Sequence, residues 1–153
     1  MKILVSACLL GENCKYSGGN NYNQAVCDFA RGHQVVPVCP EVLGGLTTPR
    51  CPAEIVQGVV TNKEGINVDR EFRAGAAKAL AIAKENGVEL AILQSRSPSC
   101  GVKEIYDGTF SGTKIPGQGV FAKMLMDEGV RVLDAGELHQ IILKNEDGKC
   151  QSD

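Results

Sequence analysis

Three short, almost continuous runs of apolar residues constrain the fold of this chain more than any other feature. They occupy residues 3–7 (ILVSA), 34–38 (QVVPV) and 88–93 (VELAIL). Runs of this length, bounded by glycine or polar residues, are typical of strands that are buried on both faces, as in a parallel sheet. We therefore predict three interior strands.

Segments with helical periodicity lie between and after these runs. A short helix is predicted over residues 23–31, and the clearest helix runs from Asp69, as its N-cap, to Gly87. A further helix around Phe121 leads to a fourth strand at residues 130–133. Strands that alternate with helices form mostly parallel sheets, because each crossover returns right-handed over the sheet. The predicted fold is α/β: a three-layer, Rossmann-like single domain with helices on both faces of a mostly parallel sheet.

The remaining segments are predicted to lie at the periphery. Residues 55–61 are rich in β-branched side chains and indicate a hairpin. Residues 95–119 form a long Gly-, Ser- and Pro-rich loop, and loops of this length are usually functional or disordered. Apolar residues at 138–142 indicate a last amphipathic helix. We place one domain at residues 1–144 and a polar C-terminal tail at residues 145–153.

Length and charge exclude several classes of function. The chain has 153 residues, the size of one domain. Its formal net charge of -2 gives it no broad basic surface for duplex nucleic acid. The longest apolar stretches are far below the ~20 residues that span a membrane. A small molecule, which can be anionic, is the expected partner.

Seven cysteines are the feature of the composition that most concerns function. The N-terminal segment has one positive residue and a short mixed run, so it is not a secretory signal. We therefore expect a cytoplasmic protein, in which thiols stay reduced. In that setting, clustered cysteines bind metal or react more often than they form disulfides.

Three of these cysteines follow the three predicted strands. Cys8 and Cys39 come at the ends of the first two strands, and Cys100 lies seven residues past the third. Neighbouring parallel strands lie ~4.8 Å apart, so thiols at their carboxyl ends can converge on one small inorganic centre. The chain has no C-x-x-C pair, and His33 and His139 fall outside any Cys/His zinc pattern.

The number of ligands decides what such a centre can do. Three thiolates are enough for a cubane iron–sulfur cluster with one open iron, although a cluster held entirely by protein takes four cysteines. An open metal position is what a catalytic site needs. Cys14 and Cys51 lie in loops expected to approach the same edge, and either would close the site as a fourth ligand. Cys27, in a predicted helix, and Cys150, in the tail, are interpreted as ordinary residues.

Polar groups accompany the three cysteines. Glu41 follows the second cysteine by two residues, and Ser97 and Ser99 belong to the run QSRSPSCG. A carboxylate near metal-bound thiolates can carry protons, and serine hydroxyls can donate hydrogen bonds. Glu41 can equally be interpreted as a surface carboxylate. The alternative interpretation of the serines is that they are ordinary loop residues. An amide pocket for an anion, with a basic residue beside it, is a further hypothesis. Its candidate glycine pairs are Gly44–Gly45 and Gly18–Gly19, with Arg50, Arg96 or Lys15 beside them; Gly44, Gly45 and Arg50 are the residues we assign to substrate binding.

Three blocks of sequence resemble one bacterial family. The blocks are SACLLG at 6–11, VPVCPEVLGGLTTPRCPAEI at 36–55, and SRSPSCG at 95–101 followed by IYDGTFSG at 105–112. In this order they resemble the domain-of-unknown-function 523 family, whose characterised type is thiouracil desulfidase. The resemblance covers nearly the whole chain.

The resemblance implies a [4Fe-4S] cluster held by three cysteines, which match Cys8, Cys39 and Cys100. The open iron would bind the sulfur of a thiocarbonyl group. Water would replace that sulfur in a non-redox reaction that releases sulfide and leaves a carbonyl. The implied substrate is a thiolated pyrimidine base, nucleoside or nucleotide.

Motif positions also imply roles for individual side chains. Glu41 and Ser97 match the carboxylate and the serine that assist the reaction, with Ser99 as a second serine and a substrate contact. The chain departs from the family pattern after SACLLG, where CKYSG places Ser17 at the usual position of an aspartate. The two additional loop thiols could also cap the open iron.

Two other functions are left open by the residues. A non-catalytic metal-binding or iron–sulfur sensor protein would be favoured by a fourth ligand that closes the site. A metal-free thiol enzyme would use Cys100 as its nucleophile and would need an activating base, for which His33 is poorly placed. Crystals grown in air are expected to lose an exposed cluster or to hold zinc or a disulfide instead.

Overall fold

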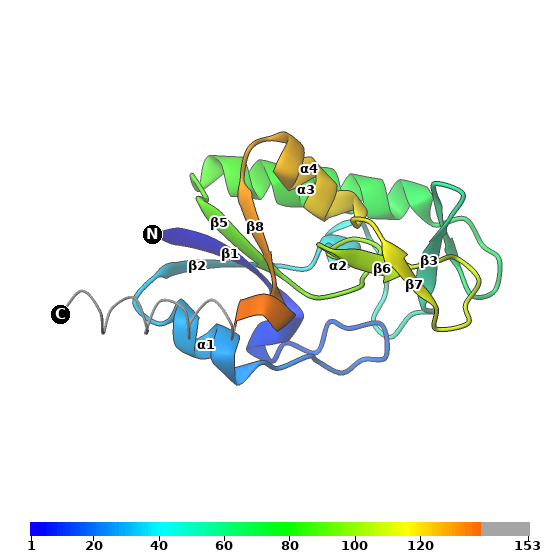
Figure 1. Ribbon diagram of the computed structural model, residues 1–153, viewed down its shortest axis with the longest axis horizontal. Helices are drawn as coiled ribbons and strands as arrows, with labels where there is room; N and C mark the ends of the chain where they lie inside the picture. Colours follow the sequence, from blue (N-terminus) through cyan, green and yellow to red (C-terminus); the bar gives the residue numbers. More distant parts are fainter. Residues whose placement is uncertain (139–153) are drawn as a thin grey trace.

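A four-stranded parallel sheet forms the centre of the described chain, which is residues 1–138 of a computed structural model. Its strand order is β2 (Gln34–Val38), β1 (Lys2–Ser6), β5 (Leu90–Leu93) and β8 (Arg131–Asp134) (Figure 1). All four predicted strands are present. β1 lies between β2 and β5, so the first connection runs to one side of β1 and a later one returns to its other side. Ligands of α/β proteins bind where the strand order reverses in this way.

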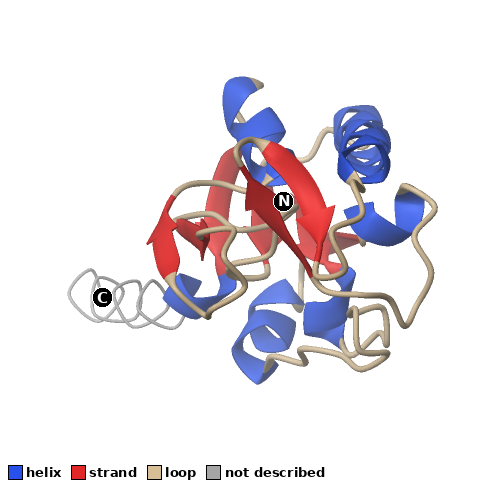
Figure 2. Cartoon of the chain, turned by 90° about the vertical axis from the view of Figure 1, so that its right-hand side faces the viewer, coloured by secondary structure: helices blue, strands red, loops and turns tan. Residues whose placement is uncertain are grey.

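Helices cover both faces of the sheet. On one face lie α3 (Asp69–Glu85) and α4 (Val120–Asp127). The other carries α1 (Gln24–Ala30) and two short 3₁₀ helices, η1 (Ala7–Leu10) and η2 (Ala135–Glu137) (Figures 1 and 2). Two separate groups of buried apolar residues form the two core layers. The predicted three-layer, Rossmann-like α/β fold is confirmed.

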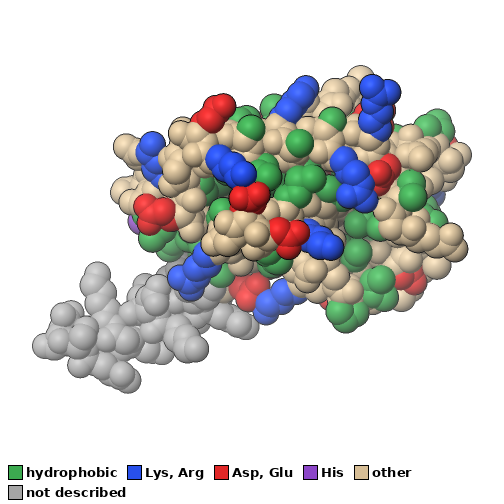
Figure 3. Space-filling model, turned by 90° about the horizontal axis from the view of Figure 1, so that it is seen from above, with side chains coloured by type: hydrophobic (Ala, Val, Ile, Leu, Met, Phe, Trp, Pro, Cys, Tyr) green, Lys and Arg blue, Asp and Glu red, His purple; other side chains and the backbone are tan. Residues whose placement is uncertain are grey.

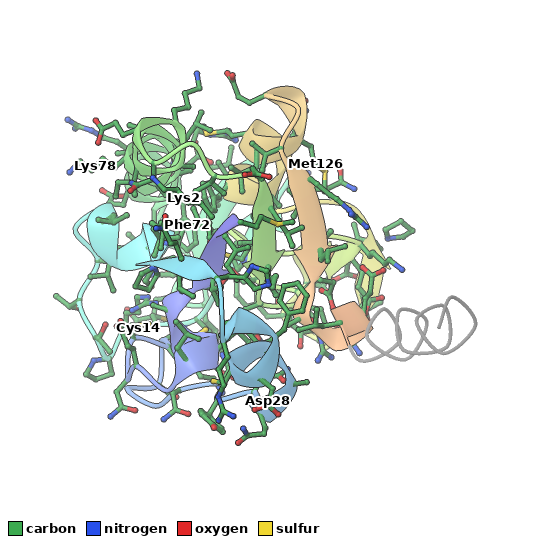
Figure 4. All side chains as sticks on the ribbon, turned by 90° about the vertical axis from the view of Figure 1, so that its left-hand side faces the viewer. Lys2, Cys14, Asp28, Phe72, Lys78 and Met126 are labelled. Atoms are coloured by element: carbon green, nitrogen blue, oxygen red, sulfur yellow. The ribbon has the colours of Figure 1, made fainter. Side chains whose placement is uncertain are left out.

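The strands supply both core layers, which explains their continuous apolar sequences. Leu4 and Ala91 belong to the layer under α3 and α4, whereas Ile3 and Ile92 belong to the layer under α1. Phe72 projects from α3 toward the sheet and is buried (Figure 4). Alternate residues of each strand therefore face opposite helical layers.

Two antiparallel hairpins lie outside the main sheet. The first, β3 (Ala53–Val56) with β4 (Val59–Asn62), is the predicted peripheral hairpin. The second, β6 (Glu104–Tyr106) with β7 (Lys114–Pro116), lies inside the predicted long loop at 95–119 and was not predicted. Its strands have three residues each and β7 is fully exposed, so no apolar alternation marks them.

Several predicted boundaries are wrong by one or two residues, and two of them matter for the packing. Asp69 is the first residue of α3 and Val68 is its N-cap. The Asp69 carboxylate instead accepts hydrogen bonds from the backbone N–H of Val60 at 3.0 Å and from Arg73 Nε at 2.7 Å. It therefore joins α3 to β4 rather than capping its own helix. The third strand begins at Leu90, two residues later than predicted.

The last helix predicted around Ile141 and the tail at 145–153 lie outside the described residues. No helix within residues 1–138 is long and apolar enough to cross a bilayer.

On the face formed by α3 and α4, basic and acidic side chains are interspersed, and no broad basic patch appears (Figure 3).

A one-turn helix, α2 (Pro40–Leu43), approaches α3 very closely and was not predicted. A Cβ atom on Gly75 would overlap the carbonyl oxygen of Pro40, and one on Gly44 would overlap the carbonyl oxygen of Glu71. Only glycine fits at these two positions without a shift of backbone. The contact holds α2, and the residues it carries, against the long helix.

We expect Gly75→Ala to destabilise the protein by about 1–3 kcal/mol through overpacking. This loss exceeds the roughly 0.5–1 kcal/mol by which alanine favours a helix over glycine. Ala77→Ser, which is exposed on the same helix, is the control and should change the free energy of unfolding by less than about 0.5 kcal/mol. Equilibrium urea denaturation measures both variants. An unchanged midpoint for Gly75→Ala would contradict the close approach.

Candidate functional site

A cavity of about 480 Å³ opens at the carboxyl ends of three parallel strands. Ser6, Val38 and Gln94, which end or directly follow β1, β2 and β5, line it. Small-molecule sites commonly have volumes of roughly 300–1,000 Å³. The cavity thus has the size and the position expected for a ligand site in a sheet of this topology.

Three cysteines from different parts of the chain line this cavity. Cys8 lies in η1 directly after β1, Cys39 lies between β2 and α2, and Cys100 ends the loop that follows β5. Burial raises the pKa of Cys8, and the nearby Cys39 and Glu41 raise it further. Burial also raises the pKa of Cys100 to about 12, with added effects of Glu41 and Cys8. The three thiols therefore share one cavity, while their role as metal ligands stays a prediction.

The donor set of the cavity, three thiols, is the one that iron–sulfur clusters use. Within residues 1–138, no three His, Cys, Asp or Glu side chains are placed to hold one metal ion. A zinc ion requires its ligand atoms within about 2.0–2.3 Å of one point. A cluster in which each cysteine binds a different iron accepts ligands that lie further apart, and thiolates are its usual ligands. The residues present fit an iron–sulfur cluster.

Glu41, in the first turn of α2, is held from two sides. Its Oε1 atom accepts a hydrogen bond from Arg50 Nε at 3.2 Å, in an ion pair whose Arg50 and Glu41 side chains are only 8% and 16% exposed. Its Oε2 atom accepts a hydrogen bond from Ser99 Oγ at 3.0 Å, and Ser97 Oγ lies 3.4 Å away. The two serine hydroxyls are 2.9 Å apart. A guanidinium, a carboxylate and two hydroxyls thus form one hydrogen-bonded chain at the cavity.

The alternating serines have different surroundings. Ser97 Oγ accepts hydrogen bonds from the backbone N–H groups of Ser99 at 3.1 Å and of Cys100 at 3.0 Å, so it shapes the loop. Ser99 is fully buried, and its hydroxyl lies 3.6 Å from the Cys100 sulfur. Ser95 instead donates to Asp134 at 2.7 Å. Ser97 and Ser99 therefore connect Glu41 to the segment that carries Cys100.

The structure does not place the glycines of the expected amide pocket, Gly44 and Gly45, in the wall of this cavity. Neither glycine lines the cavity, and Gly44 packs against α3. Arg50 does line the cavity, but its guanidinium already donates to Glu41, to two nearby threonines and to the carbonyl oxygen of Cys14 at 2.8 Å. The contacts of Arg50 therefore show it holding Glu41 and the Cys14 loop in place.

Cys14 is a fourth cysteine at the cavity. It lines the wall, and the Cys39 thiol donates to the Cys14 carbonyl oxygen at 3.8 Å. Burial, together with Cys39, raises the pKa of Cys14 to about 12. Cys51 does not line the cavity, and the thiol of Cys27, in α1, donates to a backbone carbonyl oxygen at 3.8 Å. Cys150 lies outside the described residues. Of the two loop thiols, Cys14 is the one that could close the site.

Several cavity residues were not singled out from the sequence. Asn21 Nδ2 donates to Cys8 Sγ at 3.5 Å, and nothing in the local sequence marks it. Tyr106 and Phe110 also line the cavity. Both belong to the block IYDGTFSG, which was used only to recognise the family and could have indicated them.

Comparison with known proteins identifies the family. A family model for 2-thiouracil desulfurase matches residues 3–137. The chain belongs to this family. The solved structure of [4Fe-4S]-dependent thiouracil desulfidase TudS matches with a TM-score of 0.85 and 36% sequence identity, covering 95% of this chain and 97% of that one. The uncharacterized protein YbbK of Bacillus subtilis is 42% identical over 150 residues, covering 92% of this chain and 99% of YbbK. The predicted family is confirmed.

We expect Cys100 to resist alkylation in the metal-free protein. It is 4% exposed, and burial raises its pKa to about 12, so the unreactive thiol predominates near neutral pH. Anaerobic treatment of the apoprotein with iodoacetamide, followed by mass spectrometry, should label the half-buried Cys51 well before Cys100. Equal labelling rates would contradict this expectation and would favour a metal-free Cys100 nucleophile.

Proposed function

We propose that this protein is a [4Fe-4S]-dependent desulfidase that removes sulfur from thiouracil-type pyrimidines. The observation that carries the proposal is that Cys8, Cys39 and Cys100 line one cavity together with Glu41. Family membership and the similarity to TudS support it. The overall reaction, C=S plus H₂O giving C=O plus H₂S, needs no redox change. We place the protein in the cytoplasm, where its six described free thiols would stay reduced.

The three cysteines are the proposed cluster ligands. When bound, the cluster supplies an open iron, a Lewis acid that selects soft sulfur over oxygen. Cys8, Cys39 and Cys100 would bind as thiolates, because coordination to a metal deprotonates a thiol. Asn21, whose amide donates to Cys8 Sγ at 3.5 Å, would stabilise that sulfur as a thiolate.

Glu41 is the proposed base. Its carboxylate would take a proton from water as the water oxygen bonds to the thiocarbonyl carbon. It would pass that proton to the departing sulfur as the C–S bond breaks. Arg50 and Ser99 hold the two carboxylate oxygens in place. Ser97, 2.9 Å from Ser99 Oγ, would orient the substrate or an intermediate through its own hydroxyl.

The cationic lining of the cavity favours a substrate with negative charge. Lys15, Lys63 and Arg96 line the cavity, and within residues 1–138 none of them forms an ion pair. These cations favour a thiolated nucleotide over the corresponding nucleoside or base. A lower KM for the monophosphate would support this choice, whereas equal KM values for all three forms would contradict it.

Sulfide release tests the proposed function directly. The protein would be purified and reconstituted with iron and sulfide under anaerobic conditions, desalted, and mixed with 2-thiouracil. Sulfide and uracil should appear in equal amounts. Metal-free protein is the control. No sulfide from the thiolated base, the nucleoside and the monophosphate alike would refute the proposal.

We expect Cys8→Ala, Cys39→Ala and Cys100→Ala each to lose most of the bound iron and acid-labile sulfide, because two cysteines hold a cubane cluster too weakly. Cys27→Ala is the matched control, since its thiol lies in α1 away from the cavity, and it should retain the cluster. Iron and sulfide analysis of each reconstituted variant measures the outcome. Full iron content in any of the three variants would remove that residue from the ligand set.

We expect Glu41→Gln to keep its cluster and to lose about 10²–10⁴ of kcat, the usual contribution of a general base. Glutamine preserves the size of the side chain but cannot take a proton. Glu64→Gln, on an exposed turn, is the control for a lost negative charge and should leave kcat unchanged. The variants are compared by sulfide release at equal iron content. A fully active Glu41→Gln enzyme would rule out the proposed proton carrier.

One observation favours a second candidate function. Cys14 lines the same cavity and its carbonyl oxygen accepts from the Cys39 thiol at 3.8 Å, so a four-thiolate site with no room for substrate is the second candidate, in a sensor protein. Such a protein would retain its cluster without releasing sulfide. Cys14→Ala separates the two functions. In a four-thiolate sensor the substitution would remove one ligand and open the site, whereas in a three-cysteine cluster it would leave the iron content unchanged.

A further inference from the structure

The β6–β7 hairpin supplies a part of the cavity wall to which the proposed chemistry gives no role. Tyr106, Phe110 and Gly112 line the cavity from this hairpin. None of these residues offers a carboxylate, an amine or a thiol. A wall of this kind recognises the shape of a ligand rather than reacting with it.

Phe110 has an uncommon backbone conformation. Its φ is +57°, in the left-handed region, which a bulky residue seldom adopts. Such conformations cost of order 1–3 kcal/mol and persist only when surrounding contacts impose them, most often at ligand sites. Arg96, which also lines the cavity, shares the feature with a φ of +63°. The hairpin loop is therefore held in a form that the chain would not adopt by itself.

Glu54 imposes this form on the loop. Its Oε1 atom accepts hydrogen bonds from the backbone N–H groups of Gly108 at 2.9 Å and of Phe110 at 3.1 Å. Glu54 belongs to β3, so one carboxylate joins the two hairpins. Gly108 has a φ of +91°, and a Cβ atom there would lie 2.7 Å from the Ile55 carbonyl oxygen. The loop therefore lies directly against β3.

Contacts within the loop complete its ordering. Asp107 Oδ1 accepts from the backbone N–H of Thr109 at 3.0 Å, and the Asp107 N–H donates to the Thr113 carbonyl oxygen at 2.9 Å. Ile105, in β6, forms a parallel bridge with Arg96. These contacts tie the aromatic wall to the loop that carries Ser97, and so to the side of the cavity where the reaction is proposed.

We propose that Phe110 is a specificity-determining residue whose ring packs against the flat face of a thiolated heterocycle, and that Glu54 is the positioning residue that holds it there. The inference rests on the proposed function, since it concerns the same cavity. Flat aromatic ligands gain from stacking on aromatic side chains, and removing such a side chain commonly weakens binding by about tenfold or more.

Two substitutions of Phe110 separate the ring from the backbone. Phe110→Gly removes the ring but still permits the left-handed conformation, and Phe110→Leu keeps apolar volume but not the aromatic face. We expect KM for 2-thiouracil to rise about tenfold or more in Phe110→Gly and by a smaller factor in Phe110→Leu. The iron content and kcat should change by less than about twofold. A KM within twofold of the wild type in both variants would overturn the role of Phe110.

Two substitutions of Glu54 test the positioning role. Glu54→Gln keeps a carbonyl oxygen that can accept both N–H groups, and should retain the wild-type KM. Glu54→Ala should raise KM as much as Phe110→Gly, and the double variant should rise no further, because both changes remove one effect. Glu104→Ala, exposed on β6, is the control and should behave as the wild type. If KM in the double variant rises by the product of the two single increases, the link between Glu54 and Phe110 is overturned.

Equilibrium binding distinguishes this inference from the proposed function. Binding of uracil and 2-thiouracil to wild type, Phe110→Gly and Glu54→Ala, measured by calorimetry on anaerobic protein, requires no turnover. If the wild type releases no sulfide, the proposed function fails, whereas a tenfold weaker binding in the variants still supports the aromatic wall. Equal binding by all three proteins refutes the wall whatever the activity.

Discussion

The register of two buried parallel strands is the constraint on which the site depends. β1 and β2 pair with Ser6 opposite Val38, so Cys39 follows directly at the end of β2 and Cys8 lies one residue beyond Ala7 in η1. A shift by one residue would turn every apolar side chain of a strand to the opposite helical layer. Because both layers are packed core, the shift is strongly disfavoured, and the positions of the two thiols follow from it.

A polar network joins the remaining site residues to one another. Arg50 joins α2, through Glu41, to the loop of Cys14, and Ser99 joins the same carboxylate to the segment of Cys100. A largely buried carboxylate requires such partners, since an unpaired charge is costly away from water. The close packing at Gly44 and Gly75 then fixes the position of α2, and therefore of this carboxylate, relative to α3. The protein's own contacts thus fix the position of this carboxylate beside the cysteines.

The parts that were predictable from the sequence are those that repeat a simple pattern. Continuous apolar runs revealed the parallel strands, and their ends placed Cys8 and Cys39 at one edge. The turn α2 was not predictable, because four residues show no period and because its position depends on the contact of Gly44 with α3. For the same reason, the sequence suggested a ligand pocket at Gly44 where the structure has helix packing. The β6–β7 hairpin depends on Glu54, which lies far away in the chain.

The cavity divides recognition between two walls that come from different kinds of structure. The thiols and Glu41 lie at the ends of core strands and the turn after them, where the sheet leaves little freedom, and this rigidity suits bond breaking. Phe110 lies on a peripheral hairpin held by a few backbone hydrogen bonds. Changes in that hairpin can therefore alter which ring enters without moving the reacting groups. The loop from Ser95 to Cys100 contacts both walls, through the bridge of Arg96 to Ile105 on one side and the hydrogen bond of Ser99 to Glu41 on the other, so it links the reacting groups to the hairpin.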